Sequence, residues 1–291
     1  MTRLLLSLAV LLCCAACTSR SERIARRIER SVAGLDARVG VAVRLPDGGT
    51  LLRGDTLLPM LSVFKFPVAL AVLRRAADEG IPLDTRLDLG PEWLDRGTYS
   101  PLRDSLPPDE GAVPLETLLR YSVSLSDNIA CDRLLDFAGG PAAVDAYVRG
   151  LGIDGIRIVA SERTMHLATE NQRLNVARPS ALCALFDRFL AGGLLPAAHD
   201  ALLRRLLEGT TTGPDKLRAG LPARIVLGHK TGSSDRTPDG RRIADNDAGY
   251  LLLPDGRTAT VVVLVADSRE EDATNAAAIA RIARAVVEEL R

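Results

Sequence analysis

The uneven distribution of β-like and helical segments restricts the fold of this chain more than any other feature of its sequence. Runs rich in β-branched and aliphatic residues concentrate near the two ends, where they predict strands at 39–45, 50–53, 225–230, 248–253 and 258–266. Pro46-Asp47-Gly48-Gly49 joins the first two of these strands, and Pro254-Asp255-Gly256 joins the last two. Both are turn sequences typical of hairpins, so the pattern predicts antiparallel strand pairs at both ends of the chain.

Helical patterns fill the space between the two groups of strands. They begin at 62–78 and continue to about residue 208, interrupted by loops rich in Pro and Gly. Further helices are predicted at 20–33 and 273–290. The elements together predict an α+β fold: an antiparallel sheet from both chain ends, flanked by the terminal helices, with an inserted all-helical lobe. We place the α/β lobe at about 20–60 and 217–291 and the helical lobe at about 61–216, with a site in the cleft between them.

Composition excludes several classes of protein. The 291 residues are 47% hydrophobic, and 37 Lys and Arg balance 37 Asp and Glu, which excludes an acidic disordered chain and gives no basic footprint for nucleic acid. Three His and five Cys are too few for a dense metal cluster or a disulfide scaffold, and we expect no metal and no cofactor. Cys131 and Cys183 lie in helical-looking segments, where buried thiols are the default and a disulfide between them stays open.

The N-terminal segment has the features of a secretory signal. Arg3 precedes an apolar run at 4–12 that is too short to span a bilayer permanently. Cys17 follows Ala15-Ala16, which resembles a bacterial lipobox, where the cysteine becomes the lipid-bearing first residue; cleavage near Ala16 with free release is the alternative. We expect 1–17 to be a signal peptide with a lipobox and 18–291 the folded domain. The protein would be exported across the bacterial inner membrane and be periplasmic, anchored by lipid at Cys17.

Three short motifs carry the candidate chemistry. In Ser62-Val63-Phe64-Lys65, a helix would place Lys65 one turn after Ser62 on the same face. A serine hydroxyl becomes a good nucleophile when a neighbouring base takes its proton, and an amine whose pKa is lowered by burial can do so. This motif occurs often by chance, so it indicates catalysis only in combination with others.

The second and third motifs are Ser126-Asp127-Asn128 and Lys230-Thr231-Gly232-Ser233. The first of these reads equally well as a helix cap, because Ser and Asp are common capping residues. The other lies at the end of a predicted strand, where it could present donors to a flat polar substrate, or be an edge-strand lysine beside a turn glycine.

The three motifs, in this order and separated by roughly 60 and 100 residues, resemble the signature of class A serine β-lactamases and penicillin-binding proteins. Tyr99-Ser100-Pro101 is similar to the aromatic wall segment at the mouth of that family's cleft, and Asn246-Asp247-Ala248-Gly249-Tyr250, entering a strand, is similar to the segment after Lys-Thr-Gly. The resemblance covers essentially all of the chain after the signal. It implies the fold of a serine β-lactamase or penicillin-binding transpeptidase, with 18–291 as the catalytic domain.

The resemblance also implies a carboxylate that assists deacylation, usually a Glu followed four residues later by Asn. Glu162 precedes His166 by four, as in the extended-spectrum cephalosporinase branch of class A, where His replaces Asn. Glu170 is out of step with Asn175, so we favour Glu162 over Glu170. A loop histidine bonded to the backbone is the alternative interpretation of His166.

Further roles follow from the same resemblance. Ser62 would attack the lactam carbonyl, with Lys65, or Glu162 through a water, as the base; both stay open. The backbone N–H groups of Ser62 and Ser233 would form the oxyanion hole, and Ser126 with Lys230 would pass a proton to the leaving nitrogen. The remaining substrate-binding residues would be Tyr99, Asn128, His166, Lys216, Thr231, Gly232 and Ser233. Lys216 is the first choice for a cation that joins Lys230 and Thr231 at the substrate carboxylate, ahead of Arg218 and Arg236.

The implied function is hydrolysis of the β-lactam ring of penicillins and cephalosporins by a monomer, conferring antibiotic resistance. Two alternatives share the serine chemistry: a penicillin-binding D,D-peptidase, which would not need Glu162, and a penicillin-sensing domain that is acylated without turnover. A Ser-His-Asp hydrolase is less well supported, because the chain has no Gly-x-Ser-x-Gly elbow and neither His229 nor His199, which we expect at the surface, has an evident role as base.

Overall fold

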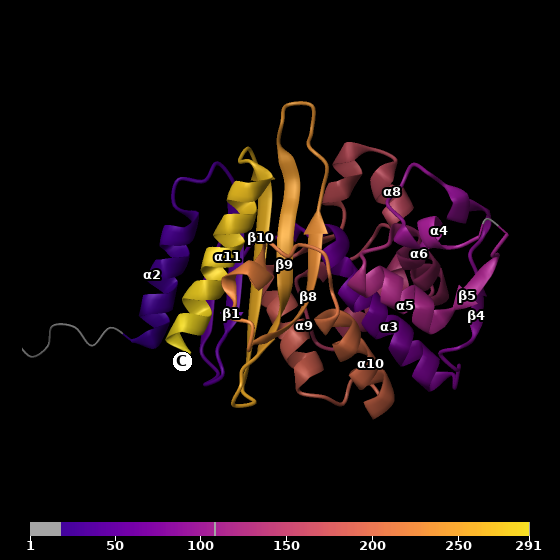
Figure 1. The fold of residues 1–291 in the computed structure, drawn as a ribbon, viewed down its shortest axis with the longest axis horizontal. Coiled ribbons are helices and arrows are strands. Elements are labelled where there is room, and N and C mark those ends of the chain that lie inside the picture. The colour runs from indigo at the N-terminus through magenta and orange to yellow at the C-terminus, as the bar shows by residue number, and fades with distance from the viewer. Residues whose placement is uncertain (1–18, 108, 291) are drawn as a thin grey trace, which may run out of the picture.

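The computed structural model describes residues 19–107 and 109–290. Its main element is a five-stranded antiparallel sheet in the order β2-β1-β10-β9-β8, with both chain ends contributing strands (Figure 1). The strands are β1 (Arg38–Arg44), β2 (Thr50–Arg53), β8 (Val226–Ser233), β9 (Arg242–Leu252) and β10 (Thr258–Ser268). The predicted α+β fold is therefore confirmed.

The sheet is covered on both faces, which explains why its central strand is apolar throughout. Successive side chains of a strand point to opposite faces. In β10, Val261 and Val263 join the core beneath the terminal helices, whereas Val262 and Leu264 join the core shared with the helical lobe. The continuous valine-rich run is thus the sequence of a strand that lies between two hydrophobic cores.

The terminal helices α2 (Arg20–Val32) and α11 (Asp272–Glu289) pack side by side against one face of the sheet (Figure 1). A capping box between Ser19 and Glu22 starts α2, and Ile24 and Ile28 on its buried stripe contact the sheet core. An ion pair from Arg23 to Glu289 joins the exposed sides of the two helices.

The helical lobe covers the other face. Its α-helices are α3 (Lys65–Asp78), α4 (Pro101–Ser105), α5 (Leu115–Ser124), α6 (Asn128–Phe137), α7 (Pro141–Gly150), α8 (Glu162–His166), α9 (Pro179–Leu190) and α10 (Ala197–Glu208). Helix α3 is buried on nearly all sides, and Phe66 stacks on Phe186 of α9 with ring centroids 4.1 Å apart. This buried helix fixes the position of the residues that immediately precede it.

Short elements complete the fold. The 3₁₀ helices are η1 (Leu61–Phe64), η2 (Pro91–Leu94), η3 (Thr169–Arg173) and η4 (Leu217–Gly220). The short strands are β3 (Leu58–Pro59), β4 (Arg86–Asp88), β5 (Ala112–Pro114), β6 (Ile156–Arg157) and β7 (Val176–Ala177), which form the small sheets β3-β7-β6 and β4-β5. Strands of two or three residues carry no readable period, so the sequence did not predict them.

Several predicted boundaries differ from the structure. The helix expected at 62–78 begins as the 3₁₀ turn η1 and becomes α-helical at Lys65. Strand β8 continues to Ser233 because its end pairs with β9, which begins at Arg242. Asn246 and Asp247 therefore lie within a strand, opposite Gly232 and Thr231, and do not merely lead into one.

Cys131 and Cys183 are both buried and free, so the disulfide left open above does not form. The predicted signal peptide and Cys17 lie outside the described residues. Within the described part of the chain, no helix is both long enough and apolar enough to cross a membrane.

Candidate active site

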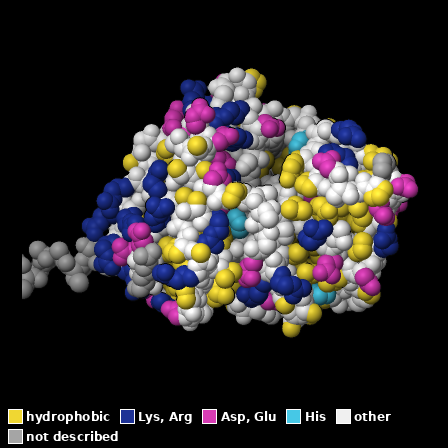
Figure 2. Space-filling view, in the orientation of Figure 1, with side chains coloured by type: hydrophobic (Ala, Val, Ile, Leu, Met, Phe, Trp, Pro, Cys, Tyr) yellow, Lys and Arg dark blue, Asp and Glu magenta, His cyan; other side chains and the backbone are white. Residues whose placement is uncertain are grey.

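Two adjoining hollows lie where the β8 edge of the sheet faces the helical lobe. One, of about 360 Å³, is lined by residues that include Ser126, Lys216 and Thr231. The other, of about 410 Å³, is lined by residues that include Tyr99, Glu162 and His166. Both include Ser62 and Ser233, so they form one cleft with the serine between them. Figure 2 shows this face of the molecule hollowed between the two lobes.

Ser62 is positioned by close backbone packing between η1 and β8. Leu61, just before it, has a φ of 45°, in the left-handed region that β-carbons disfavour. A β-carbon on Gly232 would lie 2.4 Å from the Met60 carbonyl oxygen and 3.0 Å from the Ser62 amide nitrogen. Only glycine fits there, so the Lys-Thr-Gly motif brings the strand against the serine.

Lys65 is fully buried beneath Ser62 and contacts the serine, the Ser-Asp-Asn motif and Glu162. Its Nζ lies 3.0 Å from Ser62 Oγ and 2.6 Å from the Ser126 carbonyl oxygen. It also lies 2.6 Å from Asn128 Oδ1 and 2.9 Å from Glu162 Oε1. Four oxygen partners compensate the cost of burying this polar side chain.

Glu162 Oε1 is itself 3.3 Å from Ser62 Oγ, so both candidate bases for the serine proton contact the hydroxyl. Glu170, by contrast, is exposed and paired with Arg173. The geometry therefore selects Glu162 over Glu170 as the carboxylate of the site.

Ser126 and Lys230 face each other across the cleft. Lys230 Nζ donates to Ser126 Oγ at 2.9 Å and to the Thr231 carbonyl at 3.0 Å. Burial, reinforced by the nearby charge of Lys65, holds the pKa of Lys230 well below its ordinary value. Ser126 adopts a φ of 61°, a strained conformation that places its hydroxyl at this lysine. A lysine of lowered pKa beside a hydroxyl is suited to exchange of a proton.

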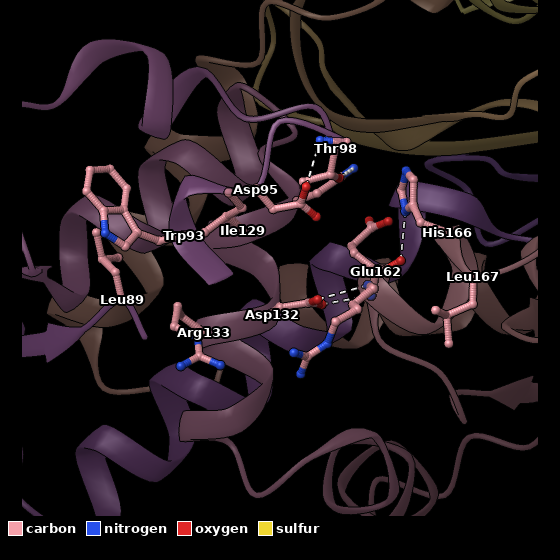
Figure 3. Close-up of a pocket in the computed structure, with 13 residues that line it drawn as sticks. Leu89, Trp93, Asp95, Thr98, Ile129, Asp132, Arg133, Glu162, His166 and Leu167 are labelled. Atoms are coloured by element: carbon pink, nitrogen blue, oxygen red, sulfur yellow. Dashed lines mark hydrogen bonds between the residues drawn. The ribbon is translucent and has the colours of Figure 1, made fainter. Parts of the chain in front are cut away.

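Asp132 holds the segment that carries Glu162. Ser161 caps α8, and the two oxygens of Asp132 accept the backbone N–H groups of Glu162 at 2.7 Å and Arg163 at 2.9 Å (Figure 3). Burial is the main cause that raises the pKa of Asp132 to about 6. The sequence prediction missed this residue; its signal was a carboxylate four positions after Asn128, one turn along the same helix face.

The pKa of Asp132 leads to a prediction of pH dependence. Below about pH 6 the carboxyl is protonated, and its O–H oxygen becomes a poor acceptor for the second N–H group, so the Glu162 segment loosens. We expect kcat to fall as pH drops through 6, with the inflection abolished in Asp132→Asn. The folding stability changes with pH in the opposite direction to kcat. Because the pKa of Asp132 is raised in the folded protein, its contribution to the free energy of unfolding increases as pH falls from 6 toward 4. A pH–rate profile of Asp132→Asn that still showed the inflection would contradict this assignment.

Asn128 and Tyr99 are joined by the cap of α6. Asp127 accepts the N–H of Ala130 and also the Ser100 hydroxyl, so the cap interpretation of the second motif is correct and the cap additionally anchors the Tyr99 segment. Asn128 Nδ2 donates to Thr98 Oγ1 at 2.9 Å. Tyr99 remains 57% exposed at the mouth of the cleft.

Lys216 is the candidate cation that lies in the cleft. Its Nζ donates to Ser233 Oγ at 2.9 Å. Arg218 instead donates to three backbone carbonyls, including that of Ile225, and Arg236 pairs with Asp272.

Thr231 projects into the same hollow as Lys216. Its hydroxyl lies 2.6 Å from that of Thr212. The preference for Lys216 thus agrees with the geometry of this end of the cleft.

The three histidines have separate environments. His166 is exposed, and its Nδ1 lies 2.7 Å from the Glu162 carbonyl, the backbone contact considered above (Figure 3). His229 is buried with Nδ1 2.8 Å from Asp247 Oδ1. His199 was expected at the surface, but it is half-buried because Nδ1 meets the Leu73 carbonyl at 3.1 Å. Among residues 19–107 and 109–290 no group of His, Cys, Asp and Glu is arranged to hold a metal.

A lysine amino group and a carboxylate within hydrogen-bond distance of one serine hydroxyl, on this α+β fold, define a serine hydrolase of the acyl-enzyme type. The model of the β-lactamase enzyme family matches residues 23–290. The chain therefore belongs to the β-lactamase enzyme family.

Individual relatives and solved structures similar to this chain are also β-lactamases. A β-lactamase of Bacteroides uniformis is 39% identical over 292 residues, covering 98% of each chain. The extended-spectrum β-lactamase PER-1 of Pseudomonas aeruginosa is 38% identical, over 92% of this chain and 87% of its own. A solved class A β-lactamase from Bacteroides cellulosilyticus superposes with a TM-score of 0.90 at 39% identity, covering 94% of this chain and 99% of its own. The resemblance to class A serine β-lactamases is thereby confirmed, and the protein is a β-lactam hydrolase.

Proposed function

We propose that this β-lactamase opens its substrate through an acyl-enzyme on Ser62, which water activated by Glu162 then releases. The observation that carries the proposal is the position of the Ser62 hydroxyl, 3.0 Å from Lys65 Nζ and 3.3 Å from Glu162 Oε1. The serine oxygen thus has two candidate bases within hydrogen-bond distance, as an activated nucleophile requires.

In the acylation step Ser62 Oγ bonds to the lactam carbonyl carbon and loses its proton to the neutral amine form of Lys65, or to the Glu162 carboxylate through a water. The N–H groups of Ser62 and Ser233 would stabilise the oxyanion, whose negative charge develops only as the bond forms. The close approach of the Gly232 backbone to the Ser62 segment, which leaves no room for a β-carbon, supports this pairing.

Collapse of the oxyanion breaks the carbon–nitrogen bond, and the nitrogen takes a proton from the Ser126 hydroxyl. Lys230 can replace that proton, because it touches Ser126 Oγ and its pKa is lowered. In deacylation Glu162 takes a proton from water as the water oxygen attacks the ester carbon, and the bond to Ser62 Oγ breaks as that oxygen takes back the proton held by Lys65 or by Glu162.

The two hollows suggest how substrate lies. The carboxylate would bind beside Lys216, Lys230 and Thr231, and the acylamino group beside Asn128. The hollow of about 410 Å³ beyond Asn128 could hold a bulky side chain next to Tyr99 and His166. Relatives named extended-spectrum β-lactamases support cephalosporins with large acylamino groups as substrates.

Turnover distinguishes this proposal from the acylated peptidase or sensor. We expect the mature protein to hydrolyse many equivalents of a chromogenic cephalosporin and to leave a D-alanyl-D-alanine peptide intact, because Glu162 lies against the reacting oxygen. Stoichiometric acylation that stops after one equivalent, or cleavage of the peptide, would contradict it.

We further propose that the protein is exported and anchored in the periplasm by lipid on Cys17. The sequence supports this through the apolar run at 4–12 and the Ala15-Ala16-Cys17 ending. Cys17→Ser should move the protein from the membrane fraction to the soluble periplasmic fraction. Unchanged membrane fractionation of the variant would exclude the anchor.

A further inference from the structure

Lys216 has a counter-ion built into the cleft. Asp245 lies on β9 directly opposite Ser233 of β8. One oxygen of Asp245, Oδ1, is 2.6 Å from Lys216 Nζ and accepts the Ser233 hydroxyl at 2.8 Å. Lys216 Nζ in turn donates to Ser233 Oγ at 2.9 Å, which closes a triangle of three polar groups.

The Lys216–Asp245 pair in this triangle is nearly buried. The side chains of Lys216 and Asp245 are 7% and 5% exposed, so their attraction is screened less than that of a surface pair. The hydroxyl proton of Ser233 is also committed, because it is donated to Asp245. A substrate carboxylate arriving here meets a lysine already paired and a serine already bonded.

Two other cations near Lys216 have different partners. Arg242 is paired with Asp272, at 2.9 Å between Nε and Oδ1. Lys230 instead donates to two neutral oxygens, the Ser126 hydroxyl and the Thr231 carbonyl. The charge of Lys216 is therefore opposed by an adjacent carboxylate, while Lys230 makes its hydrogen bonds to uncharged groups.

We propose that Asp245 is a specificity-determining residue, which positions Lys216 and the Ser233 hydroxyl while opposing the binding of the carboxylate that penicillins and cephalosporins carry. The enzyme thereby discriminates less between β-lactams with and without this negative charge. The inference rests on the proposed function, because it concerns the carboxylate end of the same cleft.

The test compares one penicillin with its methyl ester, which differ in charge and share ring and side chain. The quantity measured is the ratio of kcat/KM for the acid to kcat/KM for the ester, in which a general loss of activity cancels. Asp245→Asn keeps the shape of the side chain and removes its charge. We expect the ratio to rise at least about fivefold, since a unit charge about 4 Å from the carboxylate is worth that much with the screening of bulk water and more where screening is weaker.

Two further variants isolate the contact. Asp215→Asn removes a charge from the exposed rim of the same hollow, where water screens it, and should change the ratio less than about twofold. In a Lys216→Met background, Asp245→Asn should raise the ratio as well, because the negative charge that it removes still faces the substrate carboxylate.

An unchanged or lowered ratio in Asp245→Asn would overturn the proposal, because Asp245 would then be neutral toward the carboxylate or assist it. An equal rise in Asp215→Asn would overturn it too, because the effect would come from overall charge. Failure of the native protein to turn over either compound would instead refute the proposed function, so the two failures are distinguishable.

Discussion

Ser62→Ala is expected to lower kcat for penicillins and cephalosporins by about 10⁴-fold or more, the loss typical of removing a catalytic nucleophile. Ser62 Oγ is the atom that both Lys65 Nζ and Glu162 Oε1 approach, and alanine leaves those two groups with nothing to activate. The variant should still bind substrate, since the groups proposed to hold the carboxylate and the acylamino side chain are intact. Steady-state hydrolysis of a chromogenic cephalosporin measures the loss.

The matched control is Ser21→Ala, in helix α2 on the opposite side of the sheet, which should keep native turnover. The midpoint of thermal unfolding of both variants should be close to native. Ser62 is half-buried, and loss of its hydroxyl opens no large cavity. Turnover by Ser62→Ala within tenfold of native would show that another group is the nucleophile.

Glu162→Gln is expected to separate the two half-reactions. Glutamine keeps the shape of the side chain but cannot accept a proton from water, so deacylation should slow by about 10²- to 10⁴-fold. If Lys65 takes the serine proton, acylation persists, and rapid mixing should give a burst of one product equivalent followed by slow turnover. If Glu162 serves both steps, the burst itself should slow as well.

Glu170→Gln supplies the control for this prediction. Glu170 is exposed and paired with Arg173, so its variant should retain native kinetics. The opposite result, in which Glu170→Gln stalls turnover and Glu162→Gln does not, would move the deacylating role to Glu170.

The sheet could be predicted from sequence because its strands are long enough to show a pattern and are joined by recognisable turns. Strand β10 has a continuous apolar run, and Pro254-Asp255-Gly256 leads into it from β9. The turn at 61–64 could not be predicted in detail, because its 3₁₀ geometry depends on packing against Gly232 far along the chain. Tertiary contacts of this kind override local propensity.

The core of the site was predictable for a different reason. Ser62, Lys65, Ser126 and Lys230 belong to short motifs in a fixed order, and the structure brings all four together. The spacing of four between Glu162 and His166 also selected the carboxylate that the structure places at the serine.

Asp132 and Asp245 could not be assigned in the same way. Their positions in the sequence are those of ordinary helix and strand residues. Asp132 matters because α8 folds back onto α6, and Asp245 because β9 pairs with β8 beside Lys216. The spacing of four puts Asp132 on the helix face of Asn128, but a single sequence does not show that α8 would fold onto Asp132 or that Lys216 would lie beside Asp245.

Intact-protein and peptide mass spectrometry of Glu162→Gln mixed with a cephalosporin tests the acyl-enzyme mechanism most directly. We expect one covalent adduct per chain, located on the peptide that contains Ser62 and absent from the double variant Ser62→Ala/Glu162→Gln. An adduct on another residue, or no adduct while turnover continues at the native rate, would contradict it.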